Sequence, residues 1–145
     1  MDVVDLNQKV FKLMIRSKKI MQRFVEEEQL TTIEYYLLEE LWKFSREDKT
    51  ISMSELAQHF QVSLPAVMHK VDHLLEKRML SKISSPKDKR TKLLKLSEQA
   101  EEAILNIRKK YQDWIDAYLN YLNEDAVYLE AILNKTIAFM EGKDD

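Results

Sequence analysis

The sequence contains no cysteine, one glycine and two prolines among its 145 residues. Without cysteine the chain can form no disulfide bond and no thiolate metal site, and it has no cysteine-based redox sensor. A single glycine excludes the glycine-rich loops that hold phosphates in nucleotide-binding enzymes. Because glycine and proline are scarce while Leu, Ile, Glu and Lys are abundant, the composition favours helices over an all-β fold.

Long apolar runs are also missing. No stretch approaches the roughly 18 consecutive apolar residues that a membrane span requires, and the N-terminus lacks the basic and apolar regions of a signal peptide. Neither a Ser/His/Asp arrangement nor a metal-hydrolase pattern of histidines is recognisable. We therefore expect one cytoplasmic folding unit that is not an enzyme, binds no cofactor or metal and has no membrane partner.

Charge is distributed unevenly along the chain, although the net charge is only −2. Residues 50–95 hold nine Lys and Arg against four Asp and Glu, and they contain all three histidines. Residues 1–49 hold nine Lys and Arg against ten Asp and Glu, and residues 96–145 hold five Lys and Arg against eleven Asp and Glu. A basic centre between acidic flanks is expected if the centre contacts phosphates. A solvated basic face without a partner is the alternative.

Four helices are predicted in the first half of the chain. Apolar residues recur at helical spacing over residues 4–25. Thr31 with Glu34, and Ser52 with Glu55, have the spacing of capping boxes, which predicts a helix to about residue 46 and a short helix after residue 52. Ser63, followed by a proline in the first turn, predicts a fourth helix that ends near residue 77.

The second half begins with a different pattern. Apolar residues on both sides of the polar segment 84–90 predict a two-stranded hairpin between residues 79 and 97. Ser97 is a suitable cap for a long amphipathic helix, and Asn123 separates it from a last helix that ends near residue 140. The expected fold is mainly α, with about six helices and a small β-hairpin.

A short capped helix, a tight turn, a second helix and a basic hairpin follow one another in the order of a winged helix-turn-helix. At these positions the sequence resembles the MarR family of transcription regulators, and the resemblance extends over essentially the whole chain. It is carried by the segments Ser54-Glu55-Leu56-Ala57, Val62-Ser63-Leu64-Pro65-Ala66-Val67, Leu74-Leu75-Glu76-Lys77-Arg78-Met79-Leu80 and Asp88-Lys89-Arg90, followed by Leu94-Lys95-Leu96-Ser97.

The resemblance implies dimerisation helices in residues 1–30 and 97–145 around a DNA-binding lobe in residues 31–96. A homodimer of this kind is expected to bind a palindromic operator in double-stranded DNA, more often as a repressor than as an activator. The wing is expected to place Arg90 in the minor groove, with Asp88 orienting its guanidinium group, and the cations Lys87 and Lys89 flank them.

The predicted fourth helix offers one face to DNA. Val67, Val71 and Leu74 share the face that packs inward, and the opposite face carries Ser63, Pro65, Ala66, His69, Lys70 and His73. The early residues of this set are expected in the major groove, whereas Lys70 and His73 fit phosphate contacts. Capping is a competing role for Ser63. His69 and His73 have the spacing of a metal pair, but no suitable third ligand accompanies them.

Three positions depart from the family pattern. Arg78 stands where a glycine usually ends the recognition helix, at a position that often has a left-handed conformation. Ala100 replaces another frequent glycine. His69 occupies a position where arginine is common, so a bidentate contact with guanine is not assumed there.

The family resemblance also implies an effector. Small aromatic molecules often bind between the dimer helices and the DNA-binding lobe in this family, and such a pocket would be lined partly by Tyr35, Tyr36, Trp42 and Tyr111. Core packing is the alternative explanation of these aromatic residues. The alternative function is a winged helix that binds another protein, which predicts only weak and salt-sensitive DNA binding.

Overall fold

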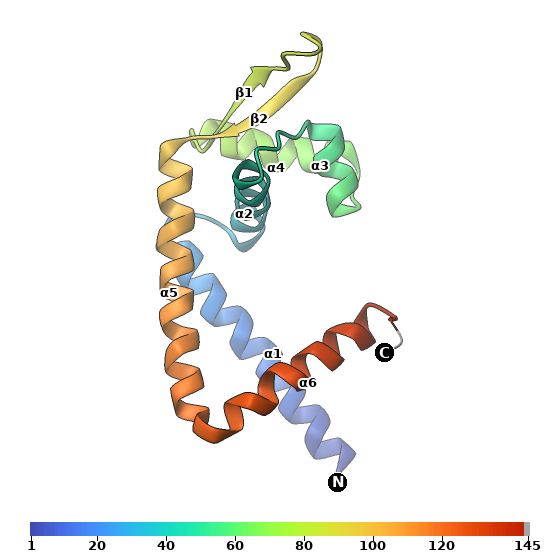
Figure 1. The fold of residues 1–145 in the computed structure, drawn as a ribbon, viewed down its shortest axis with the longest axis vertical. Coiled ribbons are helices and arrows are strands. Elements are labelled where there is room, and N and C mark those ends of the chain that lie inside the picture. The colour runs from blue at the N-terminus through green and yellow to red at the C-terminus, as the bar shows by residue number, and fades with distance from the viewer. Residues whose placement is uncertain (144–145) are drawn as a thin grey trace. The chain divides into compact units, whose positions relative to one another are not determined.

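The computed structural model describes residues 1–143, which form six α-helices, one 3-10 helix and a two-stranded antiparallel sheet (Figure 1). The elements follow the predicted order. They are α1 (Val3–Glu26), α2 (Thr32–Arg46), α3 (Met53–Phe60), α4 (Leu64–Glu76), β1 (Leu80–Ser84), β2 (Lys92–Leu96), α5 (Glu98–Leu122), η1 (Asn123–Asp125) and α6 (Ala126–Met140).

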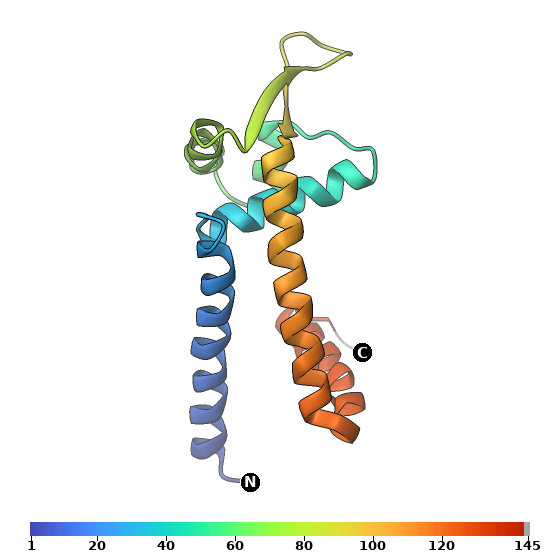
Figure 2. The same cartoon turned by 90° about the vertical axis from the view of Figure 1, so that its left-hand side faces the viewer.

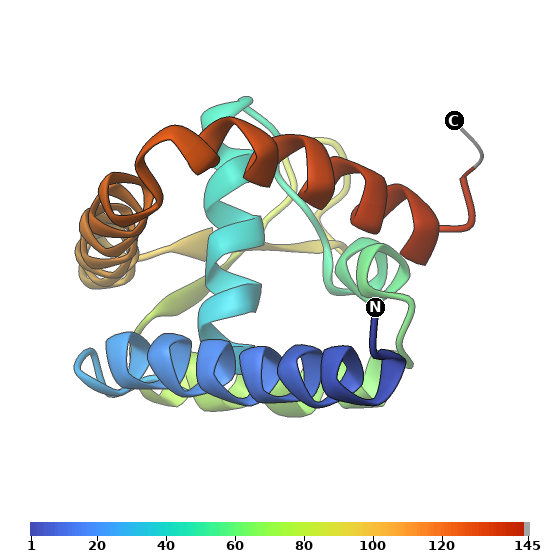
Figure 3. The same cartoon turned by 90° about the horizontal axis from the view of Figure 1, so that it is seen from below.

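The chain divides within α5 into two compact units. The first, Met1–Arg108, holds α1 to α4, the sheet and the start of α5, and the second begins at Lys109. Within the first unit, α1 is a long helix and α2 leaves its end in a different direction (Figures 2 and 3). The expected dimerisation role of residues 1–30 and 97–145 stays a prediction.

The predicted helix caps are confirmed. The Thr31 hydroxyl accepts from the Glu34 backbone N–H at 3.2 Å, and the Glu34 carboxylate accepts from the Thr31 N–H at 3.0 Å. Ser52 and Glu55 form the same reciprocal pair at the start of α3. Ser63 accepts from Ala66 at 3.3 Å, and Ser97 accepts from Ala100 at 3.1 Å. These bonds satisfy backbone donors that have no partner inside a helix, which fixes where α2 to α5 begin.

The recognition helix ends in a Schellman motif that is built without glycine. Arg78 has a φ of 59°, its N–H donates to the Leu75 carbonyl, and the Met79 N–H donates to the Leu74 carbonyl at 2.9 Å. The left-handed conformation expected at Arg78 is therefore confirmed. Gln61 ends α3 with the same pair of bonds at a φ of 55°. A side chain in this conformation has its Cβ close to the following carbonyl, which glycine avoids.

We expect Arg78→Gly to stabilise the protein by about 1 kcal/mol, because the replacement removes the left-handed strain at an exposed position. The rise should be visible as a higher midpoint of urea unfolding at unchanged slope. A midpoint equal to or below that of the wild type would show that contacts of the Arg78 side chain outweigh the backbone strain.

The wing is an antiparallel hairpin that is joined to the segment before α3. Leu80 pairs with Leu96 at one end of the ladder, and Ser84 pairs with Lys92 at the other. Ser84 thus belongs to β1, so the predicted tip at residues 84–90 is shifted by one residue, to residues 85–91. The Leu94 N–H also donates to the Ile51 carbonyl at 3.1 Å, which holds the wing beside the start of α3.

The core of the first unit lies between the end of α1, helices α2, α3 and α4, and the start of α5. Its largest side chains without solvent exposure are Leu38, Leu56, Leu74, Ile104, Ile107, Val25 and Val71. Ala100 is also fully buried, which accounts for a small residue at this position of α5. The apolar stripe of α1 is buried at its C-terminal end, where Phe24 is 7% exposed, but it is open earlier in the helix, where Leu13 is 64% exposed.

Candidate nucleic-acid interface

One face of α4 is exposed as predicted. Val67, Val71 and Leu74 are buried, with at most 3% exposure. Of the residues expected to face DNA, Lys70 is half-buried, whereas Ser63, Pro65, Ala66, His69 and His73 are exposed. The Ser63 hydroxyl accepts the Ala66 N–H, so the competing role of Ser63 as helix cap is confirmed. α4 therefore offers a continuous surface that begins at its N-terminal end.

The tip of the wing is shaped by Asp88. One carboxylate oxygen accepts from the Arg90 backbone N–H at 3.0 Å, and the other accepts from the Thr91 hydroxyl at 3.3 Å. Asp88 thus fixes the backbone from which Arg90 projects, and no ion pair between Asp88 and the Arg90 guanidinium group is present among residues 1–143. Lys87, Lys89 and Arg90 are all exposed at this tip.

A shallow groove of about 600 Å³ separates the wing from α3 and α4. Leu64 and Met68 line it from α4, and the start of α3 contributes Ser52, Met53, Ser54 and Glu55. The wing side is lined by Lys82, Arg90, Thr91 and Lys92. Lys82 and Lys92 were absent from the predicted site. Both lysines lie in the basic segment 50–95, and this charge could have pointed to them as site residues. Their position beside α3, however, depends on the register of the hairpin.

The two histidines of α4 form an exposed pair. The rings of His69 and His73 meet edge to face with centroids 4.9 Å apart. Among residues 1–143 no group of three His, Asp or Glu side chains is arranged to hold a metal ion. His69 and His73 are four residues apart on one helix, and this spacing alone brings their rings into contact.

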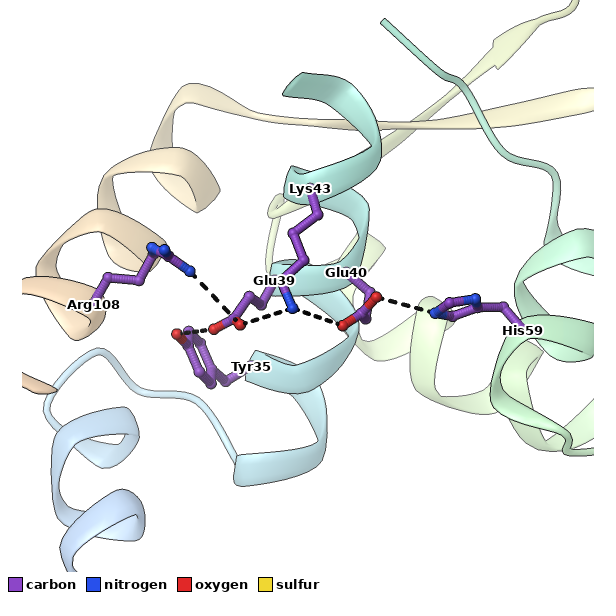
Figure 4. Close-up of polar contacts among 6 residues, drawn as sticks. All are labelled: Tyr35, Glu39, Glu40, Lys43, His59 and Arg108. Atoms are coloured by element: carbon purple, nitrogen blue, oxygen red, sulfur yellow. Dashed lines mark hydrogen bonds and ion pairs between the residues drawn. The ribbon is translucent and has the colours of Figure 1, made fainter. Parts of the chain in front are cut away.

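The four aromatic residues of the predicted effector pocket are divided between the two units, and their shared pocket stays a prediction. Tyr35 is buried and its hydroxyl donates to Glu39, whereas Tyr36 is 60% exposed on another face and its ring lies 5.9 Å from that of Phe60 (Figure 4 shows Tyr35). The Arg108 guanidinium group stacks over the ring of Trp42 at 4.6 Å. Tyr111 belongs to the second unit, where it stacks on Trp114.

Polar contacts along α2 connect it to both neighbouring helices (Figure 4). Arg108 of α5 lies 3.7 Å from Glu39, and His59 of α3 lies 3.0 Å from Glu40. Lys43 is paired with both glutamates. Burial raises the pKa of Glu40, but the hydrogen bonds from Lys43 and His59 outweigh it and hold this pKa below its usual value.

Tyr36 lines an apolar pocket of about 310 Å³ on the outer face of α2 and α4. Ile33, Leu37, Phe60, Val62, Ala66 and Val67 complete its apolar lining, and Lys70 is its one cationic residue. Ala66 and Lys70 also belong to the predicted DNA-binding set. The pocket therefore adjoins the exposed face of the recognition helix.

Comparison with known proteins connects this geometry to a family. Residues 28–91, which include α2, α3, α4, β1 and the tip of the wing, match the family model described as MarR family. This segment of the chain is similar to the MarR family. The matched segment contains the recognition helix and Arg90, so it includes the residues that carried the sequence resemblance except for Leu94-Lys95-Leu96-Ser97.

Several solved protein structures have the same fold as this chain. YusO from Bacillus subtilis is 21% identical over 93% of each chain, with a TM-score of 0.75. MepR from Staphylococcus aureus, a transcription regulator of the multidrug efflux pump MepA, is 15% identical over 92% of this chain and 97% of its own, also with a TM-score of 0.75. MepR in complex with DNA is 15% identical over 91% of this chain and 96% of its own, with a TM-score of 0.72. The predicted winged helix-turn-helix is thus confirmed.

Two further findings complete the comparison. None of the curated proteins matches the chain significantly. Within residues 1–143, no helix is both long enough and apolar enough to cross a membrane.

Proposed function

We propose that this chain is a sequence-specific DNA-binding transcription regulator of the MarR family. The observation that carries the proposal is the groove in which Leu64 and Met68 of α4 meet the cationic wing, with Lys82, Arg90 and Lys92 on the wing side. Cations beside an exposed recognition helix fit the phosphate contacts that position a protein on duplex DNA. The complex of MepR with DNA, which has a similar fold, supports this assignment.

Each part of the surface has its own role in the proposal. Pro65, Ala66 and His69 near the N-terminal end of α4 face base edges in the major groove. Lys70 and His73 contact phosphates, as do Lys87 and Lys89 of the wing. Arg90 enters the minor groove, and Asp88 supports it by fixing the turn. Binding alone blocks transcription when the site overlaps a promoter, so we propose repression, exerted in the cytoplasm without an enzymatic step.

The proposed regulator is a homodimer on a palindromic operator. In α1 the apolar residues Leu6, Val10, Leu13 and Met14 share one stripe and are each at least 44% exposed. In α6, Ile132, Leu133 and Ile137 are also exposed. Apolar stripes of this size are typical of association surfaces. A two-fold axis through such helices would place two recognition helices roughly 34 Å apart, which corresponds to two half-sites one helical turn apart.

We further propose a small aromatic acid as effector. The pocket beside Tyr36 combines an apolar lining with the ammonium group of Lys70, which suits a ring that carries a carboxylate. Since Ala66 and Lys70 belong to the proposed DNA interface, a bound effector would compete with DNA. A screen of aromatic acids by thermal unfolding and DNA binding tests this proposal, and it fails if none of them changes either quantity.

Selection from fragmented genomic DNA tests the function. The wild-type chain should enrich a few fragments that share one palindromic sequence, because two identical recognition helices read two identical half-sites. The Lys87, Lys89 and Arg90 side chains make the wing polar, which favours DNA over an apolar protein partner. If no fragment is enriched and binding is uniformly weak and salt-sensitive, the winged helix faces a protein instead.

A further inference from the structure

Lys77 connects the C-terminal end of the recognition helix to the corner between α1 and α2. Its Nζ donates to the backbone carbonyl of Gln29 at 2.9 Å and to Oε1 of Glu34 at 3.0 Å. Gln29 is the left-handed residue that follows α1, and Glu34 lies in the first turn of α2. One ammonium group thus joins the end of α4 to the turn after α1 and to the first turn of α2, which lie 48 and 43 residues earlier in the sequence.

Glu34 serves two functions with one carboxylate. Its Oε1 accepts from the Thr31 backbone N–H, as part of the α2 capping box, and also from Lys77. The side chain is 5% exposed, and its Oε2 has no hydrogen-bond partner in the part of the chain that the structure describes. Burial raises the pKa of Glu34, but the hydrogen bonds from Thr31 and Lys77 outweigh it and hold the pKa below its usual value. The buried carboxylate is therefore charged at neutral pH and depends on Lys77 for compensation.

The hydrogen bonds of Lys77 are directional, whereas the apolar packing of α4 is not. Burial of Val67, Val71 and Leu74 favours contact with the core but is non-directional. Two hydrogen bonds from one ammonium group to fixed acceptors define where the end of the helix lies. Since α4 has 13 residues and is therefore about 20 Å long, a small rotation about this end displaces the residues at the opposite, DNA-facing end.

We propose that Lys77 is a positioning residue for DNA recognition, which fixes the direction of α4 relative to α1. The inference rests on the proposed function, in which α1 contributes to the dimer interface. The direction of α4 relative to α1 then determines the separation of the two recognition helices. Lys77 makes the dimer selective for the spacing of the half-sites, whereas Glu34 and Gln29 supply the fixed acceptors.

Spacer variants of the selected operator test the proposal. One base pair inserted between the half-sites moves them by about 3.4 Å along the DNA and rotates them against each other, and we expect the wild type to lose at least about 10-fold in affinity. Lys77→Met should bind both duplexes within about 3-fold of each other. Lys77→Arg, which keeps a cation with several donors, should restore the preference.

The matched control is Lys43→Met, which removes a lysine whose ion-pair partners, Glu39 and Glu40, lie on its own helix α2 (Figure 4). It should keep the wild-type ratio of the two affinities. Thermal unfolding checks that each variant is folded, and Lys77→Gln replaces Lys77→Met if the latter is not. An unchanged spacing preference in folded Lys77→Met would overturn the proposal, even if both affinities fell.

A second measurement needs no DNA. Because the chain has no cysteine, Ala66→Cys creates a single site for a spin label at the start of α4. Pulsed electron resonance then reports the distance between the two recognition helices of a dimer, and Lys77→Met should broaden this distance distribution while Lys43→Met should not. If the wild type prefers no duplex, the proposed function fails. If the distance distributions of wild type and Lys77→Met have equal widths, the positioning role is refuted independently of that function.

Discussion

Leu13→Glu should convert the protein from dimer to monomer at micromolar concentration and reduce its affinity for the operator by about 100-fold or more. Leu13 is 64% exposed in the middle of the open stripe of α1, so in one protomer the replacement removes little packing. In a dimer the introduced carboxylate would be buried against apolar side chains without a partner, which is strongly unfavourable. The affinity falls because each monomer can occupy only one half-site.

Multi-angle light scattering and fluorescence anisotropy measure the two effects. Lys19→Glu is the control, because it also introduces a carboxylate at an exposed position of α1 but lies on the face opposite the stripe of Leu13. This variant should remain dimeric. A Leu13→Glu protein that is folded, dimeric and fully active in DNA binding would show that α1 does not form the dimer interface.

Leu74→Ala should lower the free energy of unfolding by about 2 to 5 kcal/mol. Leu74 has no solvent exposure, and its carbonyl accepts the Met79 N–H that ends the recognition helix. Met79 is also buried, so the two side chains lie on the core side of the motif that terminates α4. The substitution leaves a cavity beneath the helix that is proposed to bind DNA, and its cost includes both the lost burial and the cavity.

Urea unfolding measures this loss, with Leu64→Ala as the matched control in the same helix. Leu64 is 40% exposed, so its truncation should cost less than about 1 kcal/mol. A loss of less than 1 kcal/mol for Leu74→Ala would mean that the neighbouring side chains collapse into the space, and that α4 is less firmly packed than its burial indicates.

The local signals of the sequence predicted most of the fold. Capping residues specify where helices begin, because Thr31, Ser52, Ser63 and Ser97 each satisfy a backbone donor a few residues away. The left-handed position of Arg78 followed from the family pattern. The end of the wing shifted by one residue because Ser84 joins the ladder opposite Lys92, and such boundaries depend on cross-strand pairing.

Contacts between distant segments could not be predicted in this way. Lys77 looks like one of many helix-end lysines in the sequence, and its role depends on the backbone carbonyl of Gln29 and the buried carboxylate of Glu34. The aromatic residues of α2 illustrate the same difficulty. Tyr35 and Tyr36 are neighbours in the chain but lie on different faces of the helix, and which of them is buried depends on packing against other segments.

The central claim is that the groove between the wing and α4 reads DNA, and anisotropy with Arg90→Ala tests it most directly. Duplexes that tile the DNA upstream of the gene for this protein are titrated across a salt series, with Arg46→Ala, an exposed arginine at the end of α2, as control. We expect wild type and Arg46→Ala to bind one palindromic duplex with a Kd on the order of 10⁻⁸ M at physiological salt. Arg90→Ala should bind it about 10- to 100-fold more weakly. Uniform micromolar binding of every duplex, unaffected by loss of Arg90, would contradict the claim.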